Sequence, residues 1–110
     1  MPTEPNFVSS GYNISPFEVE TALLEHDAVA ECAVVASPDE ERGHVVKAFV
    51  VAASGFGTDE ALVAELQAHV KARIAPYKYP RRVQFLDALP RTPTGKVQRV
   101  RLRAMDPERR

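Results

Sequence analysis

The chain has 110 residues, of which 45% are hydrophobic and 26% are charged, and its net charge is −1. This length allows a single domain over residues 1–110 with one modest core, and the composition excludes disordered and collagen-like chains. The single cysteine, Cys32, excludes an internal disulfide and a cysteine-rich zinc site.

The N-terminal part predicts a turn followed by a helix. Residues 7–14 are typical of a short hairpin or an exposed loop that turns at Gly11. Ser15 and Pro16 suit the cap and the first position of a helix, and Glu18 lies three residues after the cap. The helix is predicted to run to about residue 26, with an apolar face at Val19, Ala22 and Leu23.

Two strands and a second helix are predicted next. Residues 29–36 and 45–53 are rich in β-branched residues, and the polar segment between them contains turn formers, so we predict neighbouring antiparallel strands. Thr58 is the predicted cap of the following helix, which Pro76 ends. Its apolar stripe comprises Leu62, Val63, Leu66, Val70 and Ile74.

The C-terminal third predicts a strand around Val83 and Phe85, a loop that begins at Pro90, and a short helix over residues 98–105. The order of elements indicates an α+β domain in which two or three helices cover a small, mainly antiparallel sheet. This architecture alone does not identify a function, because many binding and regulatory domains share it.

The charge is distributed unevenly along the chain. Residues 1–60 contain eleven acids and two bases, a charge of −9, whereas residues 61–110 contain twelve bases and four acids, a charge of +8. Two interpretations stay open: the two halves pair with each other in the fold, or the second half presents a basic surface to an anionic partner. No nucleic-acid partner is predicted, because the bases of residues 96–103 face several sides of a helix and few aromatic residues accompany them.

Residues 90–99 place one lysine behind a turn. Pro90 and Pro93 interrupt regular structure, and Gly95 permits backbone angles that strain other residues. These features favour a loop that presents the ammonium of Lys96 to a phosphate. A Gly-Lys pair in a polar loop is more often a solvated lysine, so the loop alone does not establish a function.

Four motifs, taken together and in order, resemble a known family. They are the Lys96 loop, Ser10-Gly11-Tyr12-Asn13-Ile14, Ser15-Pro16-Phe17-Glu18-Val19-Glu20 and Ala75-Pro76-Tyr77-Lys78-Tyr79-Pro80-Arg81. From residue 7 to residue 103 the chain resembles the C-terminal domain of adenylate-forming enzymes, and among them the medium-chain and benzoate-type acyl-CoA synthetases. The resemblance implies a ligase that joins a carboxylic acid to AMP from ATP and then passes the acyl group to coenzyme A.

The resemblance also implies roles for individual residues. Lys96 is implied as the catalytic lysine, which stabilises negative charge as the carboxylate attacks the α-phosphate. A domain movement then brings in Ser10, Gly11 and Tyr12, which are implied to contact the pantetheine arm of coenzyme A. The residues implied around its nucleotide end are Arg42, Lys71, Tyr79, Pro80 and Arg81.

The chain departs from the family pattern in three respects. Related enzymes carry an Arg-x-Asp-Asp hinge where this chain has Thr3-Glu4-Pro5-Asn6, and many have arginine in place of Asn13. The large N-terminal domain, which supplies the sites for ATP with its magnesium and for the carboxylic acid, is not among the 110 residues. We therefore expect the chain to need that domain in cis or in trans and to be inactive alone. The alternative is a freestanding module that binds coenzyme A or a nucleotide, or regulates a partner.

Other residues predict no chemistry. His26, His44 and His69 lack metal-ligand spacing, and Cys32 lies within a predicted strand as an inert thiol. The N-terminus lacks a basic and apolar leader, and the longest apolar run, residues 48–53, is too short to cross a membrane. We expect a cytoplasmic protein without a metal site or a membrane partner.

Overall fold

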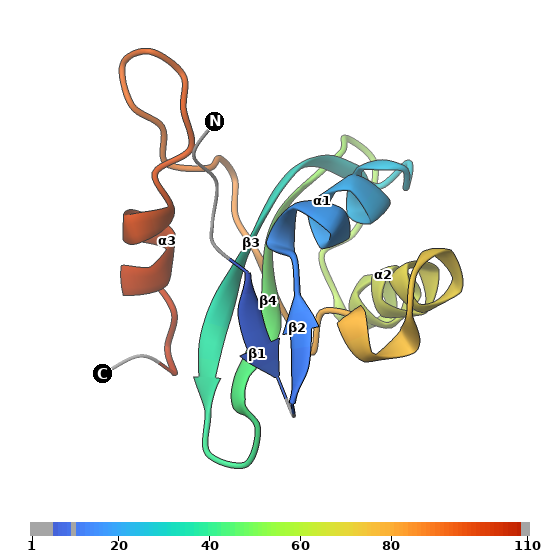
Figure 1. Cartoon of the computed structure of the whole chain (residues 1–110). Helices are drawn as coiled ribbons and strands as arrows, with labels where there is room; N and C mark the ends of the chain where they lie inside the picture. Colours follow the sequence, from blue (N-terminus) through green and yellow to red (C-terminus); the bar gives the residue numbers. More distant parts are fainter. Residues whose placement is uncertain (1–5, 10, 109–110) are drawn as a thin grey trace.

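The computed structural model describes residues 6–9 and 11–108 and shows a small sheet with helices on both of its faces (Figure 1). The described elements are, in chain order, β1 (Phe7–Ser9), β2 (Tyr12–Ile14), α1 (Pro16–Leu24), β3 (Val29–Asp39), β4 (Gly43–Ala52), α2 (Glu60–Arg73), the 3-10 helix η1 (Pro76–Lys78), β5 (Arg82–Phe85) and α3 (Arg99–Ala104). The predicted α+β class and the predicted order of elements are confirmed. No helix in the described part of the chain is long and apolar enough to span a bilayer.

The strands form a mixed sheet and a separate hairpin. In the sheet the order is β3-β4-β5; β3 and β4 are antiparallel, as predicted, whereas β5 runs parallel to β4 because α2 carries the chain back across the sheet. The hairpin joins β1 and β2, with Phe7 opposite Ile14. Gly11 takes a φ of 85° at its turn, which is the conformation that favours glycine there.

The turn between β3 and β4 is tighter than the sequence predicts. Residues 37–43 were expected to form a loop, but the strands extend into this segment and Pro38 pairs with His44. A proline is tolerated there because β3 is an edge strand of its sheet. Asp39 closes the remaining turn by accepting a hydrogen bond from the backbone N–H of Arg42 at 2.9 Å.

Both long helices begin differently from the prediction in one detail. Asp59, not Thr58, caps α2, and its carboxylate accepts a backbone N–H of the first turn at 3.1 Å. A carboxylate is the stronger acceptor and is favoured at the positive end of the helix dipole. Ser15 is the cap residue of α1 as predicted, but its side chain makes no capping bond, and Glu18 instead binds Lys78.

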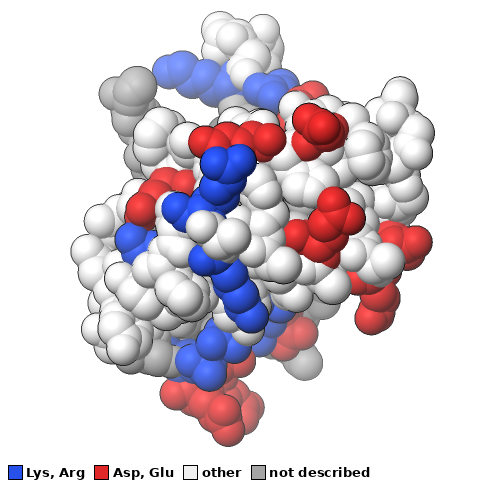
Figure 2. Space-filling view, turned by 90° about the vertical axis from the view of Figure 1, so that its right-hand side faces the viewer, with Lys and Arg blue, Asp and Glu red and all other residues white. Residues whose placement is uncertain are grey.

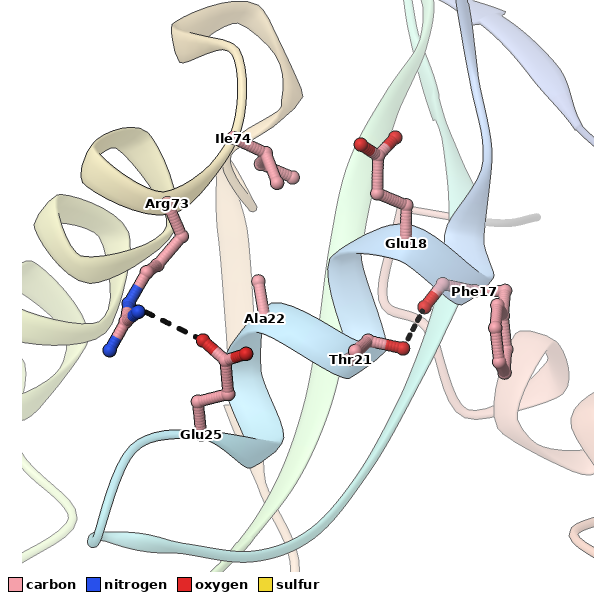
Figure 3. Close-up of a pocket in the computed structure, with 7 residues that line it drawn as sticks. All are labelled: Phe17, Glu18, Thr21, Ala22, Glu25, Arg73 and Ile74. Atoms are coloured by element: carbon pink, nitrogen blue, oxygen red, sulfur yellow. Dashed lines mark hydrogen bonds and ion pairs between the residues drawn. The ribbon is translucent and has the colours of Figure 1, made fainter.

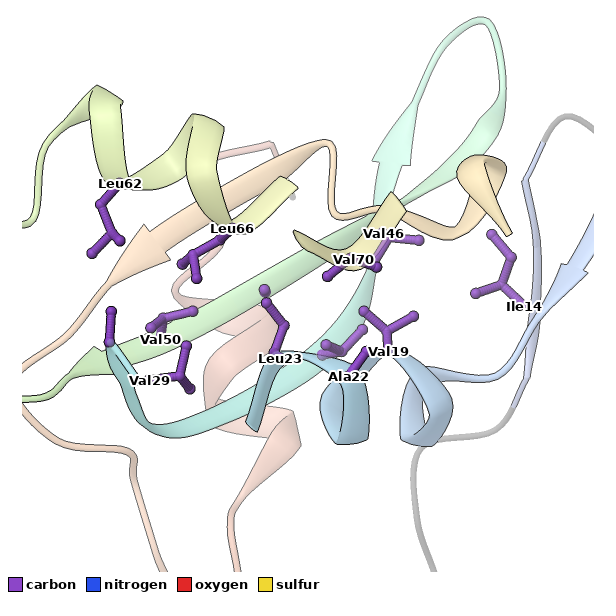
Figure 4. Close-up of a cluster of buried hydrophobic side chains, with 13 residues drawn as sticks. Ile14, Val19, Ala22, Leu23, Val29, Val46, Val50, Leu62, Leu66 and Val70 are labelled. Carbon is purple, nitrogen blue, oxygen red and sulfur yellow. The ribbon is translucent and has the colours of Figure 1, made fainter. Parts of the chain in front are cut away.

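Alternating side chains of β3 and β4 build an apolar cluster on each face of the sheet. The larger cluster lies between the sheet and the helices α1 and α2 (Figure 4), and comprises Ile14, Val19, Ala22, Leu23, Ala28, Val29, Val34, Val46, Ala48, Val50, Leu62, Leu66 and Val70. The smaller cluster lies on the side of α3 and comprises Ala33, Val35, Phe49, Leu89 and Leu102. Of the stripe predicted for α2, Ile74 is partly buried against the larger cluster and Val63 lies outside it.

Two largely buried ion pairs hold the segment around α3 against the rest of the fold. Arg99, at the start of α3, donates to both carboxylate oxygens of Glu20 at 2.6 and 3.2 Å. After α3, Asp106 accepts hydrogen bonds from Lys47 at 3.0 Å and from Ser37 at 2.6 Å. The loop that precedes α3 is therefore attached to a helix that is anchored at both ends.

The carboxylate of Asp106 makes the stability of the fold depend on pH. Burial by itself raises the pKa of Asp106, but the hydrogen bonds from Ser37, from the backbone of Glu108 and from Lys47 outweigh burial and hold the pKa below its usual value of 3.8. Because the folded pKa is lowered, this contribution to stability is present above the usual pKa and is lost as the pH falls through the folded pKa.

We expect Asp106→Asn to be less stable than the wild type at neutral pH and to lose less further stability between about pH 5 and pH 2, because the ionised carboxylate is what acid removes. Urea unfolding at a series of pH values measures the free energy of unfolding of both proteins. Parallel acid profiles for the two proteins would contradict this role of Asp106.

Candidate functional site

The lysine loop, residues 90–98, projects from one end of the molecule (Figure 1). Its two legs are joined by a bridge between Arg91 and Val97, and the N–H of Thr92 donates to the carbonyl of Lys96 at 2.8 Å. Gly95 takes a φ of 93° at the tip, and its N–H donates to the carbonyl of Thr92 at 2.8 Å. Backbone hydrogen bonds therefore hold the residue before Lys96 in one conformation.

Lys96 is exposed at the tip, and its ammonium forms no ion pair with any residue that the structure describes. The neighbouring bases differ, because Arg91 pairs with Glu31 and Arg99 pairs with Glu20. Lys96 is thus presented to solvent as a cation whose charge is not neutralised within the described fold.

The uneven charge of the chain is largely neutralised within the fold. Five ion pairs among the described residues join bases of the second half to acids of the first: Arg73 with Glu25, Lys78 with Glu18, Arg82 with Asp39, Arg91 with Glu31, and Arg99 with Glu20. Figure 2, which views the molecule from the side of α2, shows a short run of basic side chains with acidic ones on both sides. The first interpretation of the charge pattern is therefore favoured over a broad basic surface.

The tip of the β1–β2 hairpin and the β3–β4 turn lie at the end of the molecule opposite the lysine loop (Figure 1). Tyr12 of the hairpin stacks on Tyr77 of η1, with ring centroids 4.2 Å apart and planes inclined by 22°. Phe7 meets His44 edge to face at 6.3 Å, which places the turn that carries Arg42 beside the hairpin. Aromatic contacts thus gather three separate segments of the chain.

Tyr79, just after η1, lies between two basic side chains. The ammonium of Lys71 is 4.2 Å from the centroid of the Tyr79 ring, and the guanidinium carbon of Arg81 is 4.8 Å from it. Arg81 also donates to the Tyr79 hydroxyl at 2.8 Å. Pro80 is buried, and its carbonyl accepts from the amide of Gln67 at 2.9 Å, which ties this segment to α2.

A family model described as the AMP-binding enzyme C-terminal domain matches residues 18–96. The chain belongs to this family. Over 98 residues it is 61% identical to a mitochondrial acyl-coenzyme A synthetase of Rattus norvegicus, covering 87% of this chain and 17% of that protein.

Solved structures agree with this membership. An acyl-CoA synthetase of Brucella canis is 47% identical with a TM-score of 0.91, covering 96% of this chain and 20% of that one. A benzoate CoA ligase of Burkholderia xenovorans is 52% identical with a TM-score of 0.75, and the match covers 81% of this chain and 18% of that one. The chain therefore spans about a fifth of the length of these relatives, and the resemblance to acyl-CoA synthetases is confirmed.

The residues predicted from the AMP-binding family pattern fall into two groups. Lys96 lies in the lysine loop, whereas Lys71 and Arg81 flank the ring of Tyr79, and Tyr77, two residues before it, stacks on Tyr12. We call these five residues around η1, together with Pro80 and Gly11, the aromatic-basic cluster. Ser10 and the hinge positions Thr3, Glu4 and Pro5 lie outside the described residues. Arg42 is half-buried in the β3–β4 turn, and Asn13 is exposed in β2. The functional roles of all these residues stay predictions.

Sequence reasoning missed two residues that contact the predicted site residues. Tyr77 stacks on Tyr12, and the side-chain amide of Gln67 donates to the carbonyl of Pro80. Tyr77 lies inside one of the quoted motifs, but a stack between residues so far apart in the chain leaves no local signal.

Histidine and cysteine side chains of this domain have structural partners. The ring centroids of His26 and His69 lie 5.1 Å apart although the two residues are far apart in the chain. Their Nε2 atoms contact Glu65 and the carbonyl of Ala22, respectively. No group of side chains in the described ranges is suited to hold a metal ion. Burial, with the nearby charge of Glu20, raises the pKa of Cys32 to about 12, so this thiol is a poor nucleophile at neutral pH.

A groove between α1 and α2, shown in Figure 3, is lined by Phe17, Glu18, Thr21, Ala22, Glu25, Arg73 and Ile74. It contains none of the predicted site residues. Arg73 spans it to Glu25 at 3.3 Å, and Thr21 is bound to the carbonyl of Phe17 at 3.0 Å, so its polar groups are already satisfied. We assign no chemistry to this groove.

Proposed function

We infer that the chain is the mobile C-terminal domain of an ATP-dependent, AMP-forming acyl-CoA synthetase and that it serves both steps of the reaction. Enzymes of this family use ATP and coenzyme A. The observation that carries the proposal is that the lysine loop projects from one end of the molecule, whereas the tip of the β1–β2 hairpin lies at the opposite end (Figure 1), where Tyr12 stacks on Tyr77 of η1. A rotation of the domain against a larger one then presents one end or the other to a single active site.

In the first step Lys96 acts as an electrostatic clamp. Negative charge lies on both the attacking carboxylate and the α-phosphate, and a cation beside the phosphate oxygens stabilises their approach and the transition state. Lys96 forms no ion pair within the described fold, which supports this role, because a paired ammonium would first have to leave its carboxylate before it could bind the phosphate.

In the second step the aromatic-basic cluster binds coenzyme A. Lys71 and Arg81 supply cations for phosphate groups, and the tyrosines supply aromatic faces for the adenine ring. Gly11 has open space on its Cβ side and a positive φ, which suits a backbone turn that the pantetheine arm passes closely. Arg42 is proposed to contact the nucleotide end from the neighbouring turn.

Complementation tests this proposal. The 110-residue chain and the isolated large domain of a related synthetase are expected to be inactive separately, and acyl-CoA formation is expected when the two are mixed or joined into one polypeptide. Release of AMP and formation of thioester measure the activity. Turnover by the chain alone, or none in the joined protein, would refute the proposal.

The alternative is a freestanding module that binds coenzyme A. The packing of the aromatic-basic cluster within this chain favours it, because the cluster does not need another domain to form. Calorimetry with coenzyme A, together with the activity of the joined protein, distinguishes the synthetase domain from the freestanding module. A chain that binds coenzyme A tightly but gives an inactive joined protein is the freestanding module.

A further inference from the structure

The lysine loop is held by an arginine on each side. On its first leg, Arg91 donates from Nη1 to the carbonyl of Gly95 at 2.7 Å and from Nη2 to Glu31 of β3. Directly after its second leg, Arg99 is fixed by Glu20 of α1 and by a backbone carbonyl of β3. The tip and the root of the loop are therefore both tied to the body of the fold.

The ion pairs of Arg99 and Arg91 stabilise different parts of the structure. The Arg99 pair is largely buried, and it secures α3 as well as the loop. Arg91 and Glu31 are 41% and 42% exposed, so their attraction contributes little to folding. Arg91 nevertheless reaches the carbonyl of the residue that precedes Lys96. An exposed pair that ties a loop tip to a strand acts on the geometry of the loop.

We propose that Arg91, oriented by Glu31, is a positioning residue that fixes the Gly95–Lys96 peptide so that the Lys96 ammonium meets the phosphate in one orientation; this rests on the proposed function of Lys96. The planar guanidinium donates in a fixed fork, so the carboxylate bound at one nitrogen determines where the other nitrogen points. Glu31 also neutralises Arg91, which leaves Lys96 as the free cation of the loop in the described structure.

The test compares Arg91→Gln with Glu31→Gln in the chain joined to the large domain of a related synthetase. Both variants are expected to lower kcat for adenylate formation by about 10- to 100-fold, with KM for ATP nearly unchanged, because small misplacements of a reacting group cost this much. One variant removes a positive charge and the other a negative charge. If Arg91 acts through its charge, kcat should change in opposite directions in the two variants. If Arg91 positions the loop, kcat should fall in both.

Two further variants serve as controls. Arg101→Gln removes a positive charge from a nearby exposed residue whose guanidinium contacts Gln98 at 3.3 Å, and we expect its kcat to equal that of the wild type. Arg91→Lys keeps the charge but replaces the fork with a single ammonium, so we expect it to stay impaired. Thermal melting of all four variants is expected to match the wild type, because every altered side chain is exposed or paired at the surface.

The outcomes separate the positioning role from the proposed function. Opposite changes in Arg91→Gln and Glu31→Gln, an equal loss in Arg101→Gln, or normal kcat in both paired variants while Lys96→Ala is inactive would overturn the positioning role alone. Normal adenylate formation by Lys96→Ala would remove the proposed function and the positioning role together. Faster amide exchange at Gly95 and Lys96 in Arg91→Gln, measured by NMR on the 110-residue chain, supports the positioning role.

Discussion

Replacing Lys96 with alanine is expected to lower the rate of adenylate formation about 100- to 1000-fold, the loss typical of removing one charge-stabilising group from a transition state. Lys96 is exposed and free of ion pairs with the described residues, so the substitution removes little that holds the fold. Thioester formation from supplied acyl-adenylate should be largely spared, because the proposed function assigns that step to the aromatic-basic cluster and not to the lysine loop.

Single-turnover assays of the two half-reactions, on the chain joined to a related large domain, measure this difference. Arg101→Ala is the matched control: it removes a basic side chain from α3, close to the loop, that has no role in the proposed chemistry. Equal losses in both half-reactions for Lys96→Ala would show that the lysine supports folding or docking and not the first step.

Replacing Lys47 with methionine is expected to lower the free energy of unfolding by about 3 to 5 kcal/mol, because it leaves the buried carboxylate of Asp106 without its cation. The side chains of Lys47 and Asp106 are 5% and 0% exposed, and their charged atoms lie 3.0 Å apart. Lys47 also donates to the amide oxygen of Gln84 at 2.8 Å, so that oxygen loses a partner as well. Urea unfolding at neutral pH measures the change.

The double variant Lys47→Met with Asp106→Leu distinguishes a lost charge partner from lost packing. Removing both charges is expected to restore much of the stability, since an apolar pair of similar volume often replaces a buried ion pair without loss. A double variant as unstable as Lys47→Met would contradict this explanation. Arg101→Met is the exposed control, for which we expect almost no change.

Local sequence patterns predicted the elements but not the contacts that join them. The helices predicted from the spacing of apolar residues, the strands predicted from β-branched runs and the turn predicted at Gly11 all follow from short segments and are confirmed. Errors arose where two residue types compete for one local role, as at the cap of α2, where Asp59 and not Thr58 binds the first turn. The strand extension through Pro38 depends on β3 lying at a sheet edge, which is a property of the whole fold.

The candidate site shows the same division. The loop of Lys96 was predictable from its glycine and prolines, and the family resemblance indicated the residues around Tyr79. The ion pairs around the loop were not predictable, because Arg91 and Glu31, and likewise Arg99 and Glu20, are far apart in the chain. Those contacts decide which bases in and directly after the loop are neutralised, and they leave Lys96 as the base there without an ion pair among the described residues.

The two half-reactions, compared in Lys96→Ala and in Arg81→Gln, test most directly whether the domain works from both ends. We predict a crossed result, in which Lys96→Ala loses adenylate formation and keeps thioester formation, and Arg81→Gln keeps the first and loses affinity for coenzyme A in the second. Variants that both impair the same half-reaction would contradict the assignment of one step to each end of the domain.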